Sequence, residues 1–203
     1  MIFVDEIKKE ISIMLHPSKA SSMSIGQALS FYYKLAFIPF ILSLILTYVL
    51  GNTIFPGWSS FVSESGWLAG LPLMLIRLLI DLVGFLVLFP ISILIYAGLF
   101  HLFGKFLFKI YKSDYKDTVT GVIYALGANI LVSWLIIIPI IGFITLIFSL
   151  WSTIILILAL AKLQKTSGLA SFGVILGSIL LTGIILAAVF FLIFFLALGY
   201  FVR

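Results

Sequence analysis

The hydrophobic pattern of this chain consists of long apolar runs, most of them about 20 residues or more, separated by short polar segments. An apolar helix of about 20 residues is long enough to cross the hydrocarbon core of a bilayer. The pattern therefore predicts an all-α membrane protein. The membrane helices that it predicts cover residues 35–55, 71–108, 119–138, 142–161 and 169–198.

The second of these stretches is too long for one simple crossing. From its start to Gly104 it would extend about 51 Å as a helix, whereas the hydrocarbon core is about 30 Å thick. One long kinked helix and a hairpin that crosses twice both fit this length. Pro90 lies in the middle of the stretch and is the natural place for a kink.

The distribution of lysines decides between these two alternatives. The lysines fall into three clusters, within residues 8–34, 105–116 and 162–165. The positive-inside rule places all three clusters in the cytoplasm, so an even number of crossings must separate each cluster from the next. Residues 71–108 are then one long kinked helix, and Pro139–Gly142 divides residues 119–161 into two helices. The result is a five-helix transmembrane bundle with its N-terminus inside and its C-terminus outside.

Residues 1–34 are expected to form a cytoplasmic segment ahead of the transmembrane domain, residues 35–203. Val4, Ile7 and Ile11 recur at helical spacing, followed by Met14 or Leu15, and charged residues lie mostly opposite. This pattern predicts a short amphipathic helix. It could lie on the membrane surface or dock on the protein's own bundle. Ser24 and Gln27 then have the spacing of a capping box, which predicts the start of the next helix.

Composition narrows the class of protein. Hydrophobic residues make up 64% of the 203 residues and charged residues only 9%, with a mean hydropathy of +1.35. These values indicate a multi-pass integral membrane protein and exclude a nucleic-acid-binding protein.

Motifs for catalysis are missing from the sequence. The chain has no cysteine, and His16 and His101 are far apart and belong to no metal-binding motif. No nucleophile elbow or phosphate-binding loop occurs in the required context. We therefore expect a protein that is not an enzyme and has no cofactor and no metal. His101 lies one helical turn before Lys105 and is expected to face the inner headgroups.

Few polar groups lie within the predicted spans. Arg77 and Asp81 are four residues apart and can pair on one helix face. They could be an ion or proton site, but a self-neutralised structural pair at the outer interface is favoured. Asn129 and Ser133 form a second pair with the same spacing. Asn129 could bind a substrate, although hydrogen bonding between helices is favoured.

Small residues mark one face of the last predicted helix. Ala170, Gly173 and Gly177 have the spacing that lets another helix approach closely. Packing within the monomer is favoured over a seam between two copies of a homo-oligomer.

The most distinctive polar segment is Lys105–Thr118. Its lysines are predicted to bind anionic lipid headgroups, and the segment could also dock a cytoplasmic protein partner. The residues expected to make these contacts are Lys105, Lys109, Tyr111, Lys112, Tyr115 and Lys116.

Short sequence motifs occur along nearly the whole chain in an order that resembles the Yip family, the Ypt/Rab-interacting membrane proteins. They are Leu15-His16-Pro17-Ser18, Phe31-Tyr32-Tyr33, His101-Leu102-Phe103-Gly104, Tyr115-Lys116-Asp117-Thr118, Tyr124-Ala125, Pro139-Ile140-Ile141-Gly142, Trp151-Ser152 and Lys165-Thr166-Ser167-Gly168-Leu169-Ala170. The Asp-Leu-Tyr-Gly-Pro signature of eukaryotic members does not occur in the sequence. The resemblance therefore points to a prokaryotic, archaeal-type branch.

This resemblance implies five spans, a cytosolic N-terminus and a non-enzymatic role in membrane trafficking or organisation. A prokaryotic member would lie in the cell membrane, and a eukaryotic one in ER or Golgi membranes. The expected function is that of a scaffold or adaptor that recruits partners or lipid headgroups at its cytoplasmic face. The alternative is a small transporter or channel component, for which Asn129, Ser133, Thr145 and Ser149 could provide a polar route. A lipid-modifying enzyme ranks last.

Overall fold

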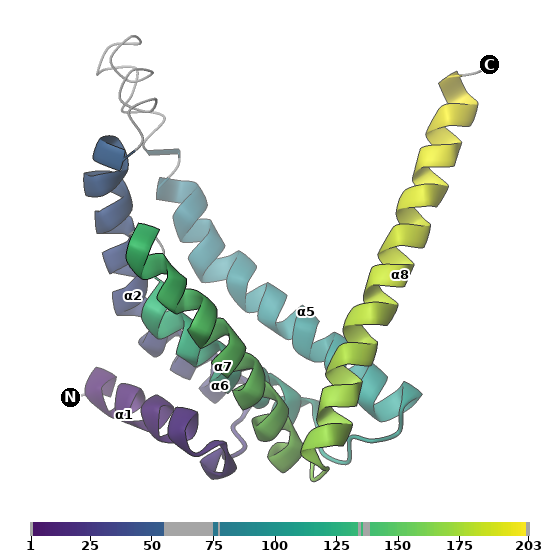
Figure 1. Cartoon of the computed structure of the whole chain (residues 1–203), viewed down its shortest axis with the longest axis horizontal. Coiled ribbons are helices and arrows are strands. Elements are labelled where there is room, and N and C mark those ends of the chain that lie inside the picture. Colours follow the sequence, from purple (N-terminus) through teal and green to yellow (C-terminus); the bar gives the residue numbers. More distant parts are fainter. Residues whose placement is uncertain (1, 55–74, 77, 134, 136–138, 202–203) are drawn as a thin grey trace.

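The computed structural model describes residues 2–54, 75–76, 78–133, 135 and 139–201. Within these residues the chain is helical, with short turns and no strand, so the prediction of an all-α protein is confirmed. Figure 1 shows the elements. They are α1 (Ile2–Leu15), η1 (Pro17–Lys19), α2 (Ile25–Ile54), η2 (Gly84–Leu88), α5 (Phe89–Leu102), η3 (Phe103–Leu107), α6 (Tyr115–Val132), α7 (Pro139–Leu163) and α8 (Gly168–Phe201).

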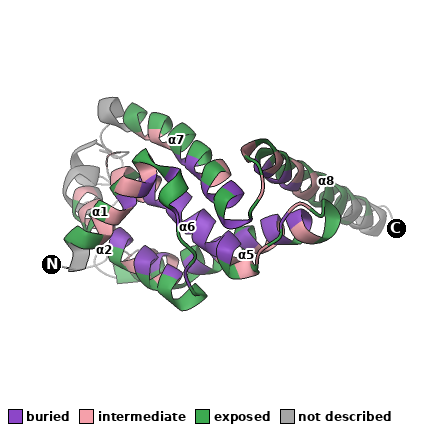
Figure 2. Ribbon diagram, turned by 90° about the horizontal axis from the view of Figure 1, so that it is seen from below, coloured by how far each residue is buried: buried purple, intermediate pink, exposed green. Residues whose placement is uncertain are grey.

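Four helices of the described chain are long and apolar enough to cross a membrane, namely Ile25–Leu46, Leu78–Leu107, Phe143–Leu163 and Gly168–Phe195. A multi-pass membrane protein is therefore supported. Helix α6 is not among the four, although it runs beside α7 in the middle of the bundle (Figure 1). Residues 117–125 of α6 are all buried (Figure 2). A helix that is surrounded by protein does not face lipid, so it can carry threonines, glycines and an asparagine.

Helix α2 begins as the sequence predicts, because the capping box forms. The backbone N–H of Ser24 donates to Oε1 of Gln27 (3.0 Å), and the N–H of Gln27 donates to Oγ of Ser24 (3.3 Å). These two bonds satisfy donors that a helix start leaves free. The helix then continues without interruption through position 35. The membrane helix therefore starts at Ile25 and not at the predicted position 35. One continuous helix joins the N-terminal segment to the bundle.

The long helix predicted for residues 71–108 is described at residues 75–76 and then without a gap from position 78. It runs continuously to Leu107, with the π-helical segment η2 just before Pro90 and a second one, η3, at its end. Pro90 has no N–H, so it cannot donate to the carbonyl of Leu86 one turn earlier. The hydroxyl of Tyr33 on α2 donates to this carbonyl instead, at 2.7 Å. A neighbouring side chain thus makes the proline tolerable inside an apolar helix.

The last two helices contain the spans predicted at 142–161 and 169–198. Pro139 is the first residue of α7, so the predicted turn Pro139–Gly142 is instead the first turn of a helix, where a missing N–H costs little. Between α7 and α8 the chain turns at Lys165, which has a left-handed backbone (φ 54°). Ser167 then caps α8, because its Oγ accepts from the N–H of Ala170 (3.2 Å).

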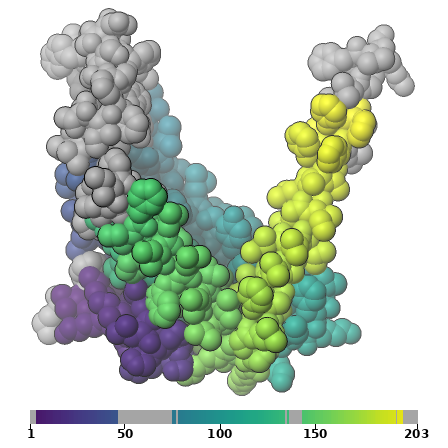
Figure 3. All heavy atoms as spheres, viewed as in Figure 1, coloured from purple at the N-terminus to yellow at the C-terminus, as the bar shows by residue number. Residues whose placement is uncertain are grey.

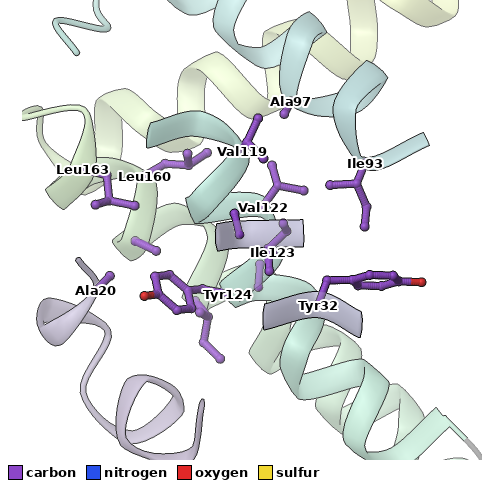
Figure 4. Close-up of a cluster of buried hydrophobic side chains, with 14 of the residues drawn as sticks. Ala20, Tyr32, Ile93, Ala97, Val119, Val122, Ile123, Tyr124, Leu160 and Leu163 are labelled. Carbon is purple, nitrogen blue, oxygen red and sulfur yellow. The ribbon is translucent and has the colours of Figure 1, made fainter. Parts of the chain in front are cut away.

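The hydrophobic core surrounds α6 (Figure 4). Tyr124 and Ile123 of α6 are fully buried, and Leu160 of α7 packs beside them. The ring of Tyr124 meets the ring of Phe31 edge-on, with centroids 5.7 Å apart. This core joins α2, α5, α6 and α7 to the short segment that follows α1.

Helix α8 joins this core only near its start, through Val174 and Ile175. It meets α7, α5 and η3 near its first turns and then diverges, so that the molecule has the shape of a V (Figures 1 and 3). Only 6% of its most apolar window is buried in the protein. Side chains such as Ile184 and Phe190 are exposed to more than half of their surface. This arm of the V therefore relies on lipid, or on another protein, to cover its surface.

Candidate functional site

The three lysine clusters, far apart in sequence, meet at one end of the bundle. The ammonium group of Lys162 donates to the carbonyl of Ser18, and the N–H of Lys112 donates to the carbonyl of Gln164 at 3.4 Å. We call this end, which carries Lys19, Lys105–Lys116 and Lys162–Lys165, the lysine end. The opposite end of the helices is the far end. All three clusters therefore lie on the same side of any membrane that the bundle spans.

The lysines of segment 105–118 differ in exposure. Lys109, Lys112 and Lys116 are exposed. Lys105 is half-buried, and its ammonium group donates to the carbonyl of Ser113 at 3.4 Å. Three of the four lysines can thus reach headgroups or a partner, while the fourth helps to hold the segment in place.

The two tyrosines of this segment point inward, unlike the partner-contacting role expected of them. Tyr111 is only 4% exposed, and its ring lies against Gly104, where a Cβ would come within 2.4 Å of the ring. Burial raises the pKa of its hydroxyl, and nearby Ser171 lowers it by a smaller amount. The hydroxyl of Tyr115 donates to the carbonyl of Leu94 at 2.7 Å. In this conformation the tyrosines anchor the segment, and the lysines form its surface.

Gln164 holds segment 105–118 in place through hydrogen bonds, although no pattern in the sequence singles it out. Its side chain is fully buried. Its Nε2 donates to the hydroxyl of Thr118 (3.0 Å) and to the carbonyl of Asp114 (3.2 Å), and its Oε1 accepts from the N–H of Ser113 (3.1 Å). A buried amide with all of these partners satisfied makes the connection between η3 and α6 rigid.

His101 belongs to the same buried network and does not face headgroups. Its exposed fraction is 9%, its Nδ1 lies 3.0 Å from the hydroxyl of Thr118, and its ring packs edge-on against Tyr115. The segment therefore rests on side chains from α5, α6 and the α7–α8 turn.

Helix α1 docks on the bundle, which is one of the two placements that its sequence allows. It packs on α6, α2 and α7. Glu6 forms an ion pair with Lys34 (3.2 Å), and the indole N–H of Trp151 donates to the carbonyl of Met14 (3.1 Å). Ile13 is buried, whereas Val4, Ile11 and Leu15 stay exposed. The helix thus has one apolar face toward the protein and a second one available to the membrane surface.

The most unusual side chain of this interface is Glu10. It is fully buried, and neither carboxylate oxygen has a hydrogen-bond partner. The carboxyl group occupies a notch on α6 that exists because residue 127 is glycine, since a Cβ there would lie 2.3 Å from it. Burial raises the pKa of Glu10 to about 8, and the nearby Lys9 ammonium lowers it by less. The carboxyl group is consequently protonated when α1 is docked at neutral pH.

Three of the four polar residues predicted inside the spans line one cavity toward the far end. The volume of this cavity is about 580 Å³, and Asp81, Asn129 and Ser133 contribute to its wall. Asn129 also accepts a hydrogen bond from Ser149 (3.3 Å), which joins α6 to α7. Arg77, the expected partner of Asp81, lies outside the described residues.

The small residues of α8 are not used equally. Gly177 packs within the monomer, because a Cβ there would come within 2.7 Å of the Phe108 ring. Gly173 is exposed, and nothing lies within 4 Å of a Cβ placed on it. Ala170 is half-buried. Only part of the predicted face therefore packs against protein.

The described residues contain no group of three or more His, Cys, Asp or Glu side chains that could hold a metal ion. No family model, curated protein or solved structure matches the chain.

Proposed function

We propose that this protein is a non-enzymatic membrane scaffold or adaptor that recruits a protein partner at its lysine end, in the manner of the Yip family that its sequence resembles. The observation that supports this most is the fixed presentation of exposed lysines. Lys109, Lys112 and Lys116 are displayed by a segment that hydrogen bonds to Gln164 and from Tyr115 hold in place. A surface held in one conformation costs a partner less ordering entropy.

The proposal includes an orientation and a topology. The lysine end faces the cytoplasm, as the positive-inside rule requires. Helix α6 also crosses the membrane and brings the total number of crossings to five. Anionic headgroups bind to the same lysines, with about 1 kcal/mol per side chain. Helix α1, docked beside this end, presents Val4, Ile11 and Leu15 to the adjoining bilayer surface. Membrane organisation is thus combined with recruitment on one face.

Crosslinking in native membranes followed by mass spectrometry tests the proposal. The native chain is compared with the pair Lys112→Gln and Lys116→Gln and with a control pair of equal charge, Lys8→Gln and Lys19→Gln. All four lysines are exposed at the same end of the bundle. We expect at least one cytoplasmic protein that is crosslinked to the native chain and the control but is lost from the 112/116 variant.

The outcomes separate a partner site from a lipid anchor. If both pairs reduce every crosslink equally, the surface acts through its total charge on anionic lipid, and the adaptor proposal fails. The same result follows if no crosslinked protein depends on either pair. Topology is measured in each variant, because fewer lysines weaken the positive-inside bias.

A second candidate, a small transporter or channel component, is favoured by the cavity that Asp81, Asn129 and Ser133 share. A path from this cavity to the lysine end would have to pass residues 117–125 of α6, which are buried by their neighbours. Flux of protons, Na⁺ and K⁺ into proteoliposomes tests this candidate. Transport that is abolished by Asp81→Asn would favour it over the scaffold.

A further inference from the structure

The cavity between α2, the helix 78–107 and α6 has the size of a ligand site. Its volume of about 580 Å³ lies within the range of about 300–1,000 Å³ that is typical of small-molecule pockets. Its walls come from three helices, which contribute residues such as Phe40, Phe85 and Leu126.

One wall of the cavity is an irregular stretch of helix. Gly84, Phe85 and Leu88 belong to the π-helical segment η2 and line the cavity. Such π-helical segments inside α-helices occur frequently at functional sites. A Cβ placed on Gly84 would meet nothing within 4 Å, so this wall leaves open space. The irregular stretch of helix and the cavity therefore coincide.

The carboxylate of Asp81, the amide of Asn129 and the hydroxyl of Ser133 lie toward the far end of the cavity, whose wall also includes the hydroxyl-bearing side chains of Tyr32 and Ser43. The hydroxyl of Ser133 already donates to the carbonyl of Ile130 (2.9 Å), so its lone pairs remain. Among the described residues no hydrogen bond or ion pair engages the carboxylate of Asp81. Toward the lysine end the walls become apolar and aromatic, with Phe85 and Ile93. The occupant should therefore carry hydrogen-bond donors, or positive charge, at one end and an apolar body at the other.

The dimensions of the cavity match one leaflet of a bilayer. Asp81 lies near the far end of the candidate span Leu78–Leu107, at the level where headgroups begin. From Asp81 to Ile93 a helix rises about 18 Å, which is comparable to the hydrocarbon of a single leaflet, about 15 Å. A lipid whose headgroup is at Asp81 would thus place an acyl chain along Phe85 and Ile93.

We propose that this cavity binds one lipid of the far leaflet, with an ammonium headgroup that donates hydrogen bonds to Asp81 and an acyl chain between α2, α5 and α6. The class of ligand is a glycerophospholipid with a primary amine, of the phosphatidylethanolamine type. A quaternary ammonium has the same charge but no N–H donor, so phosphatidylcholine fits less well. This site is independent of the lysine end and of the function proposed there.

Lipid retention by the purified full chain tests the proposal. The protein is placed in nanodiscs with equal parts of phosphatidylethanolamine, phosphatidylcholine and phosphatidylglycerol of identical acyl chains, then released into detergent and weighed by native mass spectrometry. We expect one retained phosphatidylethanolamine per chain. Asp81→Asn should reduce its retention by about tenfold, as expected for the loss of a charge-assisted hydrogen bond.

A matched pair of glycine variants tests the location. Gly84→Leu fills the cavity, whereas Gly98→Leu adds the same side chain to the same helix outside the cavity. A Cβ at either glycine meets nothing within 4 Å. We expect the retained lipid to be lost only from Gly84→Leu.

Three results would overturn the proposal. The first is equal retention of the three lipids by the native chain, which would identify them as surrounding bilayer lipid. The second is unchanged retention in Asp81→Asn, which would remove the headgroup contact. The third is equal loss from both glycine variants, which would indicate a general defect in packing. If Gly84→Leu fails to fold, Asp81→Asn, which keeps the shape of the side chain, still decides the headgroup contact.

Discussion

At the scale of single residues, burial of Glu10 makes the docking of α1 dependent on pH. In water a glutamate titrates near pH 4.5, whereas in the notch at Gly127 its pKa is about 8. Below pH 4.5 the carboxyl group is protonated in the docked and the free helix, so pH has no effect. Between pH 4.5 and 8 only the docked helix keeps the proton. Docking is therefore strongest in acid, weakens by up to about tenfold per pH unit, and loses this contribution above pH 8.

Spin labels on α1 and on the bundle measure this effect. Labels at Lys8 and Lys165, both exposed, should give one short distance at pH 5 and a broad, longer distribution at pH 9. Glu10→Gln cannot ionise and should keep the short distance at both pH values. A native chain that stays docked at pH 9, or a Glu10→Gln chain with the same pH response, would contradict the prediction.

Gly104, at the lysine end, makes room for a buried side chain just as Gly127 makes room for Glu10. Adding one methyl group there places Cβ 2.4 Å from the Tyr111 ring, which has no free space to move into. We expect Gly104→Ala to lower the free energy of unfolding by about 1–3 kcal/mol, the usual cost of overpacking. Gly98→Ala, on the same helix with open space around Cβ, is the control and should be neutral or slightly stabilising.

Thermal unfolding in detergent and limited trypsin digestion at Lys109 and Lys112 provide the measurements. In Gly104→Ala a displaced Tyr111 should loosen the segment and speed its cleavage. Equal stability and equal cleavage of the two alanine variants would show that Tyr111 does not hold the segment.

Sequence reasoning predicts some of these residues and not others, for physical reasons. The lysines 109, 112 and 116 are found because unpaired charge must be at a surface. Glu10 is missed because a helix that is apolar on two faces, docked by one and exposed by the other, has an ambiguous helical wheel. Gln164 is missed because one glutamine in a short polar turn has no pattern. Tyr111 is assigned to the surface because its partner, Gly104, becomes close only through the fold.

At the scale of elements, Pro90 and Tyr33 form a unit that spans two helices. The hydroxyl of Tyr33 satisfies the carbonyl of Leu86 that Pro90 leaves without its usual donor. Tyr33→Phe should therefore lower the free energy of unfolding in detergent by about 0.6–2 kcal/mol, the range for hydrogen bonds between membrane helices. In a Pro90→Ala background the alanine N–H can donate to Leu86, so the same change should cost less.

A double-mutant cycle of these two substitutions isolates their coupling. Ser92→Ala is a useful comparison, since Ser92 bonds to the carbonyl of Phe89 within its own helix. Additive effects of Tyr33→Phe and Pro90→Ala would show that Tyr33 stabilises the bundle in another way.

The elements themselves follow closely from hydrophobic pattern and capping. The ranges 142–161 and 169–198 lie within α7 and α8, and the Ser24–Gln27 box marks the start of α2. Boundaries are less well predicted. The start at 35 follows from hydropathy alone, whereas the helix begins at its cap. A helix that began at 35 would have Pro39 in its first turns, whereas Pro39 lies deep inside α2. Helix α6 begins at Tyr115, before the predicted start at 119. Beyond position 133, only residue 135 of the predicted range 119–138 is described.

At the scale of the whole molecule, the packing connects topology to charge. The contacts Lys162–Ser18 and Lys112–Gln164 hold all three lysine clusters at one end. Whichever way the bundle lies, an even number of crossings separates these clusters. The four candidate spans and α6 together satisfy this parity, with α6 and α7 as a hairpin. A bundle of four spans in which α6 does not cross would leave α7 as the single crossing between the clusters at 105–116 and 162–165 and would place them on opposite sides, so parity favours five spans over four.

Labelling with a membrane-impermeant thiol reagent tests the count of five spans, because the native chain has no cysteine. We expect Lys8→Cys, Lys112→Cys and Lys165→Cys, all at exposed positions, to react only from the cytoplasmic side, which the lysines select. Ser133→Cys near the far end of α6, also exposed, should react only from the opposite side if α6 crosses the membrane. Reaction of positions 112 and 165 from opposite sides would indicate four spans. Reaction of positions 8 and 112 from opposite sides would contradict both the proposed topology and the packing of the lysine end.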